Sequence, residues 1–239
     1  MSSPAAVFWD MDGTLIDTEP LWGIATYELG ELLGRPLTPE VRAKTVGGSF
    51  ANTLGIVAKW AGYSLVDGDL EHYRTWMYAR MGELFAEGIE CNPGVAGILA
   101  SLAQRGTPML VTTNTERELA DPCIDAIGRE YFTDTITGDE VAHPKPAADM
   151  YLEAARRVGA EPRDCLVFED SWNGMSAAAA AGCVVLGLAE RVPAGVTPFA
   201  PRVFVGASAA DVDMAEALRG EADRFADTPR VPAATSLAD

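Results

Sequence analysis

The chain has 239 residues, of which 48% are hydrophobic and 22% are charged, and its formal net charge is −17 at pH 7. This length and composition are typical of a globular protein with a sizeable buried core. The negative charge argues against nucleic acid or an anionic membrane surface as the main partner, because nothing offsets phosphate repulsion. It does not exclude a small phosphorylated substrate, since a site can be locally positive or can bind a metal ion.

The cysteines and apolar runs indicate the environment of the protein. The four cysteines are widely spaced and form no CxxC pair, so we expect no disulfides and a reducing compartment. The N-terminus has no basic segment followed by an apolar stretch, and no apolar run is long enough to span a membrane. We therefore expect a cytoplasmic monomer whose partner is a small metabolite.

Five short apolar runs have the pattern of buried parallel strands, which lack strict alternation when helices cover both faces of a sheet. They span residues 5–9, 108–112, 164–168, 183–188 and 202–205. Helices are expected between them: one bracketed by Asn92 as N-cap, Pro93 and Gly106, a second over 149–158 and a third over 174–181. This alternation predicts an α/β fold with a doubly wound parallel sheet.

Residues 18–90 break the alternation, because they show only helical patterns punctuated by glycines. The expected helices span residues 21–33, 39–44, 51–61 and 69–85. We interpret this segment as an all-α cap, inserted above the strand ends where α/β sheets bind ligands. The catalytic core would comprise residues 1–17 and 91–220, and residues 221–239 would form a loose tail.

Polar side chains gather where the predicted strands end. In chain order they are Asp10, Asp12, Thr112, Thr113, Asn114, Lys145, Glu169 and Asp170. Because the carboxyl ends of parallel strands lie at the same edge of a sheet, we expect five of these side chains to converge there: Asp10, Asp12, Thr112, Glu169 and Asp170. Repulsion among the four carboxylates would be costly unless a cation lay between them. Oxygen ligands without a positioned histidine or cysteine favour a hard divalent cation such as Mg²⁺ over zinc.

Four features of the sequence resemble, in order, the four motifs of haloacid dehalogenase-like hydrolases. They are DMDGT, the threonine that ends a second strand, HPKP and FEDSWNG. The helical insertion and the segment DTEPLW resemble more narrowly the subgroup that holds β-phosphoglucomutase and small sugar-phosphate phosphatases. The match covers roughly residues 5–206. The second aspartate favours phosphate esters as substrates, because the dehalogenases of the family lack an acid there and the phosphonate hydrolases have alanine.

The resemblance implies a catalytic role for four residues. Asp10 would be the nucleophile that forms an aspartyl-phosphate. Asp12 would protonate the leaving alcohol and then deprotonate the attacking water. Thr112 and Lys145 would hold the phosphoryl oxygens, and Lys145 would also restrain Asp10.

The resemblance also implies a metal site and a substrate site. Mg²⁺ would be held by Asp10, Asp170 and the backbone carbonyl of Asp12, with Glu169 behind them or acting through a water. The residues expected to contact the phosphate or the rest of the substrate are Thr113, Asn114, Glu19, Trp22, Gly48 and Ser49.

Three functions stay open: a Mg²⁺-dependent phosphatase acting on a small organic phosphate, a phosphosugar mutase, and a non-catalytic protein that binds a phosphorylated ligand. Trp22 and Phe50 stand where the sugar mutase of the family has a histidine and a phosphate-binding arginine, which favours the phosphatase. A protein that only binds its ligand need not keep both a nucleophile and an acid, which argues against the third function.

Overall fold

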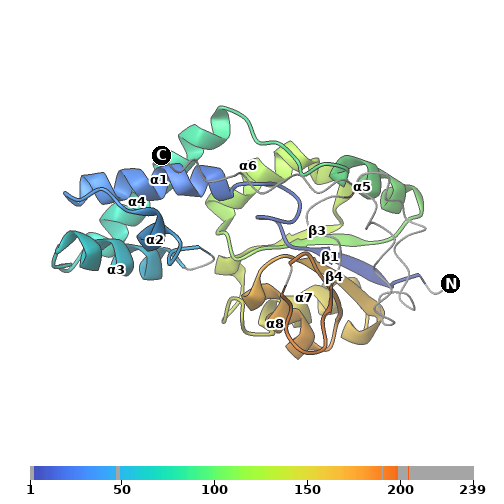
Figure 1. The fold of residues 1–239 in the computed structure, drawn as a ribbon. Helices are drawn as coiled ribbons and strands as arrows, with labels where there is room; N and C mark the ends of the chain where they lie inside the picture. The colour runs from blue at the N-terminus through green and yellow to red at the C-terminus, as the bar shows by residue number, and fades with distance from the viewer. Residues whose placement is uncertain (1–2, 47–48, 190, 199–203, 205–239) are drawn as a thin grey trace.

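The computed structural model of the chain describes residues 3–46, 49–189, 191–198 and 204. Within them, one parallel sheet has the strand order β3-β2-β1-β4-β5-β6. The strands are β1 Ala6–Trp9, β2 Met109–Thr112, β3 Asp134–Ile136, β4 Cys165–Glu169, β5 Val184–Gly187 and β6 Thr197–Pro198. The strand order reverses between β1 and β4, the place where ligands bind in such sheets. The predicted doubly wound α/β fold is therefore confirmed (Figure 1).

Two strands differ from the sequence expectation. β3 and β6 were not predicted, because they have only three and two residues and carry little apolar pattern. The strand expected over residues 202–205 lies outside the described residues except for Phe204, which is not in a strand. The tail expected over residues 221–239 also lies outside them.

Helices cover both faces of the sheet and form the insert. They are α1 Glu19–Leu32, α2 Pro39–Arg42, α3 Phe50–Ala61, α4 Asp69–Ala86, α5 Val95–Gln104, α6 Arg117–Ile127, α7 Asp149–Val158 and α8 Trp172–Ala181. Short 3-10 helices follow α6, β3 and α7, at Arg129–Tyr131 (η1), Gly138–Glu140 (η2) and Pro162–Asp164 (η3). Helix α6 was missed because Pro122 interrupts its helical pattern. Among the described helices, none is long and apolar enough to cross a bilayer.

The start of α5 corrects one sequence-based expectation. Asn92 is not the N-cap, because the helix begins at Val95 after Gly94. The buried Asn92 amide instead donates to the carbonyl oxygens of Gly13, at 3.3 Å, and Thr14, at 2.9 Å. It therefore ties the turn after β1 to the segment that leads into α5.

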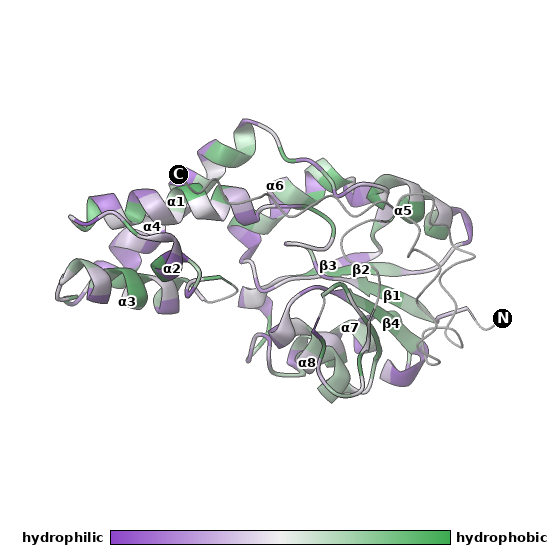
Figure 2. Ribbon diagram, viewed as in Figure 1, coloured by the Kyte–Doolittle hydropathy of each residue, from purple (hydrophilic) through white to green (hydrophobic). Residues whose placement is uncertain are grey.

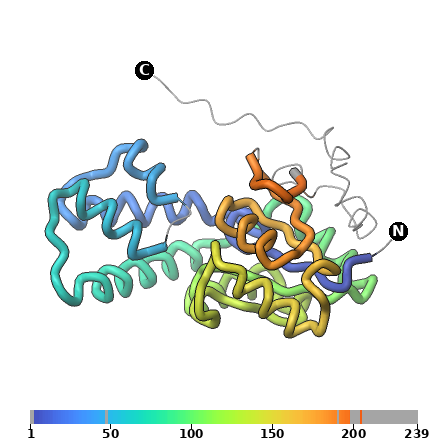
Figure 3. The backbone as a smooth tube through the Cα atoms, turned by 90° about the horizontal axis from the view of Figure 1, so that it is seen from below, coloured from blue at the N-terminus to red at the C-terminus, as the bar shows by residue number. Residues whose placement is uncertain are grey.

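Helices α1 to α4 form the helical insert between β1 and α5. The ribbon in Figure 1 shows it as a lobe beside the sheet, and the backbone tube in Figure 3 shows the same lobe from below. The two connections run side by side, because Ile16 pairs with Cys91 in an antiparallel bridge. The Asn92 N–H also donates to the Leu15 carbonyl at 2.8 Å. Within the insert, the Nε of Arg80 in α4 donates to Glu28 in α1 at 2.6 Å.

The sheet separates two apolar clusters, as expected for strands that are buried on both faces (Figure 2). On one face, Trp9 stacks on Phe168 with ring centroids 4.4 Å apart. This cluster continues into α5, α6 and the helical insert. On the other face, Phe8 packs with the buried faces of α7 and α8. The central strands therefore have little freedom to shift, which fixes the polar residues at their ends.

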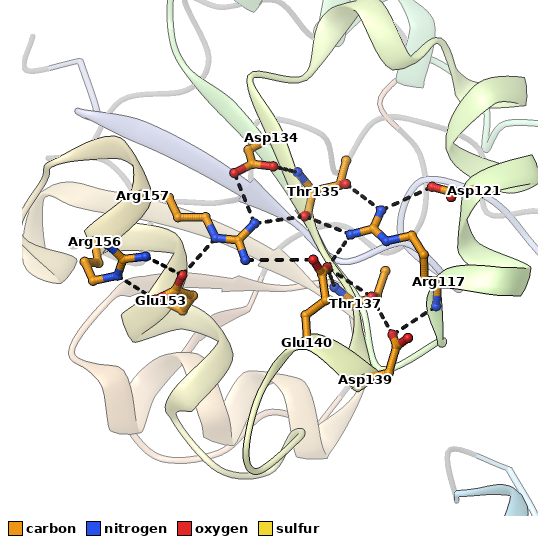
Figure 4. Close-up of polar contacts among 10 residues, drawn as sticks. All are labelled: Arg117, Asp121, Asp134, Thr135, Thr137, Asp139, Glu140, Glu153, Arg156 and Arg157. Atoms are coloured by element: carbon orange, nitrogen blue, oxygen red, sulfur yellow. Dashed lines mark hydrogen bonds and ion pairs between the residues drawn. The ribbon is translucent and has the colours of Figure 1, made fainter.

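An ion-pair network covers the sheet edge at β3 (Figure 4). Arg117 of α6 donates to the Thr135 hydroxyl at 2.8 Å and to its carbonyl at 3.1 Å. Arg157 of α7 donates to Asp134 at 3.1 Å and to the Thr135 carbonyl at 3.3 Å. Glu140 accepts from Arg117. These charged side chains block the exposed strand edge from pairing with another chain.

The close approach of α8 to β4 gives a testable prediction. A Cβ atom at Gly174 would lie 1.7 Å from Glu169 Oε1, so Gly174→Ala should destabilise the fold, by about 3 kcal/mol for a clash of this kind. Gly97→Ala is the matched control, because Gly97 lies in α5, is exposed, and nothing would lie within 4 Å of the added atom. It should stabilise the fold by about 0.5–1 kcal/mol. Urea unfolding of both variants measures the difference, and equal stabilities would contradict the packing at Gly174.

Candidate active site

A buried lysine joins the ends of the two central strands. Lys145 Nζ donates to Asp10 Oδ1 at 2.6 Å, to Glu169 Oε1 at 2.5 Å and to the Thr112 carbonyl at 2.9 Å. The Lys145 and Glu169 side chains are 3% and 0% exposed, and the Asp10 side chain is 10% exposed. Such charge-assisted hydrogen bonds are strong where water is excluded. The ammonium group therefore fixes the position of Asp10 relative to β4.

The protonation of this cluster follows from its charges. Burial and the Glu169 carboxylate raise the pKa of Asp10 well above its ordinary value, and Lys145 opposes this shift. Burial alone would lower the pKa of Lys145, but the carboxylates of Asp10 and Glu169 raise it well above its usual range. One positive charge is thus shared by two carboxylates, and a further cation beside Asp10 would favour its charged form.

The oxygen atoms of Asp10, Glu169 and Asp170 can converge on a metal ion, because one oxygen from each lies within 4.8 Å of the others. Gly13 makes this approach possible. Its φ angle is +85°, and a Cβ atom there would lie 2.2 Å from Asp170 Oδ2. A set of carboxylate oxygens alone fits a hard divalent cation.

Protein donors engage both oxygens of the Glu169 carboxylate. Oε1 accepts from Lys145 and from the Tyr151 hydroxyl at 2.8 Å. Oε2 accepts from the Ser171 N–H at 3.2 Å and from its hydroxyl at 3.0 Å. Glu169 is therefore built to hold Lys145 and the start of α8, and its influence on an ion would be exerted through its neighbours.

Three threonine hydroxyls orient the Asp12 carboxylate. Thr18, at the start of α1, donates to Oδ1 at 2.5 Å. Thr115 and Thr113, in the loop after β2, donate to Oδ2 at 2.7 Å and 3.3 Å. Asp12 is partly exposed, unlike Asp10. It is thus a fixed carboxylate two residues from Asp10 that a substrate can reach.

Thr112 corrects a second expectation. Its side chain is fully buried, and its hydroxyl donates to the Trp9 carbonyl at 3.2 Å, so it does not line the site. The reason is strand alternation, because neighbouring residues on β2 point to opposite faces. The hydroxyl of the next residue, Thr113, donates a hydrogen bond to the Asp12 carboxylate instead.

Asn114 holds two loops together. Its side-chain oxygen accepts from the Lys145 N–H at 2.9 Å, and its amide nitrogen donates to the Lys145 carbonyl at 3.0 Å. The turn at Gly138 packs on the same loop, because a Cβ atom there would lie 2.3 Å from the Asn114 carbonyl oxygen. Asn114 therefore positions the backbone of Lys145, and its expected contact with the substrate stays a prediction.

The insert residues that are expected to contact the substrate have partners within the insert and in the apolar core. Glu19 pairs with Arg42 of α2 at 2.7 Å, and the half-buried Trp22 packs against the apolar cluster that includes β1. The Ser49 hydroxyl accepts from the Asn52 N–H at 3.3 Å and caps α3. Gly48 lies outside the described residues. The role of these residues in substrate binding stays a prediction.

Sequence reasoning missed three polar residues that support the site: Thr18, Thr115 and Tyr151. The two threonines gave no signal, because a hydroxyl beside a carboxylate is visible only after the loops are placed. The sequence did contain a signal for Tyr151. This residue lies on the apolar face of the predicted helix over residues 149–158, where a buried hydroxyl needs a partner.

The two neighbouring threonines give a second prediction. Thr113→Val should lower kcat/KM for an aryl phosphate about 10-fold or more, because Asp12 loses one of the donors that orient it. Thr112→Val is the matched control, and it should keep kcat/KM within about threefold while costing about 1 kcal/mol of stability for its hydrogen bond. Steady-state kinetics and thermal unfolding of both variants test this. A larger kinetic loss at Thr112 would restore the original assignment.

Comparison with known proteins agrees with this geometry. Residues 4–182 match the haloacid dehalogenase-like hydrolase family. The chain is 31% identical over 178 residues to the phosphorylated carbohydrates phosphatase of Thermotoga maritima, which covers 74% of this chain and 81% of that protein. It is 32% identical over 184 residues to the phosphoglycolate phosphatase of Chromobacterium violaceum, which covers 76% of this chain and 83% of that one.

A solved structure is also similar. It is a mutant of CbbY from Rhodobacter sphaeroides in complex with xylulose-(1,5)bisphosphate, with 27% identity, a TM-score of 0.67, and coverage of 80% of this chain and 93% of that one. The family match spans most of the chain, and the curated relatives exceed 30% identity over three quarters of it. The chain therefore belongs to the haloacid dehalogenase-like hydrolases and is a phosphatase of that family, acting on phosphoric monoesters.

Proposed function

We propose that the protein is a Mg²⁺-dependent phosphatase that hydrolyses a phosphate monoester of a small metabolite, a sugar phosphate or a related compound, through an aspartyl-phosphate on Asp10. The observation that carries the proposal is the buried Lys145, which bonds Asp10 and Glu169 at 2.6 Å and 2.5 Å while Asp12 lies two residues further on. The relatives named for phosphorylated carbohydrates and for phosphoglycolate support small phosphate esters as the substrate class.

Asp10 is the nucleophile in this proposal. One of its oxygens accepts from Lys145, which leaves the other oxygen of the carboxylate to attack phosphorus. The attack forms the bond between this oxygen and phosphorus, and the bond from phosphorus to the leaving oxygen breaks. The Lys145 ammonium holds Asp10 in place and stabilises negative charge that develops on the phosphoryl oxygens.

Asp12 moves the protons. It donates a proton to the leaving oxygen in the first step, and then accepts one from the water that attacks the aspartyl-phosphate. The hydroxyls of Thr18, Thr113 and Thr115 keep its carboxylate in one orientation through both steps. The second step releases inorganic phosphate and restores the Asp10 carboxylate.

The donor set fits Mg²⁺. Asp10, Asp170 and the Asp12 backbone carbonyl would hold the ion, with Glu169 behind them, and the ion would supply positive charge that screens Asp10 from the phosphate dianion. The negative charge of Asp10 would then be balanced by two cations, the ion and the Lys145 ammonium.

The helical insert, about residues 18–90, would act as a cap that excludes water in the first step and admits it in the second. Its two adjacent connections, near Ile16 and Cys91, suit movement as one body. Hydrolysis is favoured over phosphosugar transfer, because Trp22 and Phe50 offer no positive charge for a second phosphate. We also propose that the protein works as a monomer.

The nucleophile gives a third prediction. Asp10→Asn should lower the rate of phosphate release from an aryl phosphate by at least about 1,000-fold, because the nucleophile is lost while its size is kept. Asp17→Asn is the matched control, since Asp17 is an exposed aspartate in the same segment, and its rate should be unchanged. Circular dichroism verifies that both variants fold. A rate for Asp10→Asn within tenfold of the wild type would exclude the aspartyl-phosphate.

The metal gives a fourth prediction. Activity should disappear in excess EDTA and return with Mg²⁺, whereas Ca²⁺ should inhibit, because it accepts more oxygen ligands and can occupy the attacking oxygen of Asp10. Calorimetric titration should show that Asp170→Asn weakens Mg²⁺ binding by about tenfold or more. Full activity in EDTA would overturn the metal assignment, and equal rates with Ca²⁺ would overturn only the geometric reason.

A further inference from the structure

The loop between β2 and α6 contacts the carboxylate that moves the protons in the proposed function. Thr113 and Thr115 of this loop donate to Asp12 at 3.3 Å and 2.7 Å. Glu116 follows Thr115 directly and begins α6 as its N-cap residue. Any contact that fixes Glu116 therefore also limits how far the donors to Asp12 can move.

The side chain of Glu116 does not serve its own helix. Its backbone carbonyl accepts from the Leu119 N–H at 3.0 Å and the Ala120 N–H at 2.9 Å, but its carboxylate makes no capping hydrogen bond. Glutamate is also not among the residues that are preferred at an N-cap. The carboxylate instead accepts from Arg74 Nη2 on α4 of the insert, and α4 contacts α6. The glutamate at this position is thus explained by the insert and not by α6.

Tyr78, one turn further along α4, holds the guanidinium of Arg74 in place. The central carbon of the guanidinium lies 4.4 Å from the centroid of the Tyr78 ring, which is close enough for a cation–π contact. Tyr78 is 8% exposed, and burial and the Glu116 carboxylate raise its pKa to about 12, so the phenol stays neutral near pH 7. The guanidinium is therefore oriented toward Glu116 by its own helix.

The contact between Arg74 and Glu116 is the only ion pair that joins the helical insert to the core in the part of the chain that the structure describes. Arg42 and Arg80, which also lie in the insert, pair with glutamates of the insert itself. The side chains of Arg74 and Glu116 are 29% and 34% exposed, and ion pairs with this degree of exposure add little to stability. The consequence of the pair is therefore where it holds the loop that begins α6.

From this arrangement we infer that Arg74 and Glu116 are positioning residues for the acid of the reaction. Their ion pair holds the start of α6 against α4, which keeps the Thr115 hydroxyl on the Asp12 carboxylate. The inference rests on the proposed function, in which a proton passes from Asp12 to the leaving oxygen as the bond from Asp10 to phosphorus forms and the bond from phosphorus to that oxygen breaks. Arg74 and Glu116 neither gain nor lose a proton in this step.

The test compares two aryl phosphates with the full-length enzyme and Mg²⁺, because their leaving groups differ in the need for a proton. Phenolate is a basic leaving group that needs one, whereas 2,4-dinitrophenolate is a stable anion that does not. Glu116→Gln should lower kcat/KM for phenyl phosphate by about tenfold or more, and that for 2,4-dinitrophenyl phosphate by less than about threefold. A role in folding or in phosphate binding would lower both values equally.

Variants of Arg74 test whether the two residues act together. Arg74→Met should reproduce the selective loss on phenyl phosphate. Combined with Glu116→Gln, it should cost no more than about twofold beyond either single variant, because both substitutions break the same contact. Arg74→Lys keeps a positive donor, and its kcat/KM for phenyl phosphate should stay within about threefold of the wild type.

Two control variants remove charges from the same helices. Arg80→Met removes a cation of α4 whose partner, Glu28, lies in the insert, and Glu118→Gln removes an exposed carboxylate from the first turn of α6. Both should leave kcat/KM for the two esters within about twofold of the wild type. The melting temperatures of Arg74→Met and Glu116→Gln should fall by less than about 4 °C, because the ion pair is partly exposed.

Asp12→Asn separates failure of the inference from failure of the proposed function. This variant should lower kcat/KM for phenyl phosphate far more than for the dinitrophenyl ester, and equal losses would contradict the proposed role of Asp12 and thus the proposed function. If Asp12→Asn distinguishes the two esters but Glu116→Gln lowers both equally, or neither, the inference is overturned while the proposed function stands. Additive losses in the double variant would also overturn it, because the two residues would then act independently.

Discussion

The ion cluster around Lys145 is the constraint on which the rest of the site depends. A lysine that is almost fully buried needs anionic partners, and it finds them in Asp10 on β1 and Glu169 on β4. The distances are met only if β1 and β4 are neighbours in the observed register, with Trp9 opposite Phe168. The sheet topology and the position of Asp10 are thus parts of one arrangement.

Further contacts make this arrangement rigid. Tyr151 and Ser171 engage the Glu169 carboxylate, and Asn114 holds the backbone on both sides of the Lys145 peptide. The absence of a side chain at Gly174 lets α8 approach Glu169. Each of these residues acts on Asp10 only through another residue, yet together they determine where its carboxylate lies. Preorganisation of this kind is a main source of catalytic rate in a dry site.

The sequence predicted those features that depend on local pattern. The apolar runs identified β1, β2, β4 and β5, and the glycine-punctuated helices identified the insert. Asp10, Glu169 and Asp170 were predicted to converge because parallel strands end at one edge, and the structure brings their oxygens together. Lys145 was predicted to complete the pocket, and it donates to Asp10 and Glu169. Neighbouring residues of a strand point to opposite faces. The sequence could therefore also have shown that Thr112 and Thr113 point in different directions, if the last residue of β2 had been known to within one position.

Other features depend on contacts between distant segments and leave no local signal. Asn92 has the residue type of an N-cap, but its amide bonds to the turn after β1 instead. Arg42 and Arg74 lie on helices where solvated charges are common, and both form ion pairs with residues far away in sequence. The strand β3 is too short to be recognised by pattern and is defined by the arginines that bond to it.

The bridge between Ile16 and Cys91 has a consequence for how such enzymes diversify. Because the chain enters and leaves the insert at two paired residues, the intervening segment closes a loop whose ends are already held together. The entropy of closing such a loop grows only slowly with its length, so a longer, shorter or rebuilt insert would leave the strand register almost unaffected. In the proposed function, the chemistry belongs to the sheet and the choice of substrate to the insert, so the two could change separately.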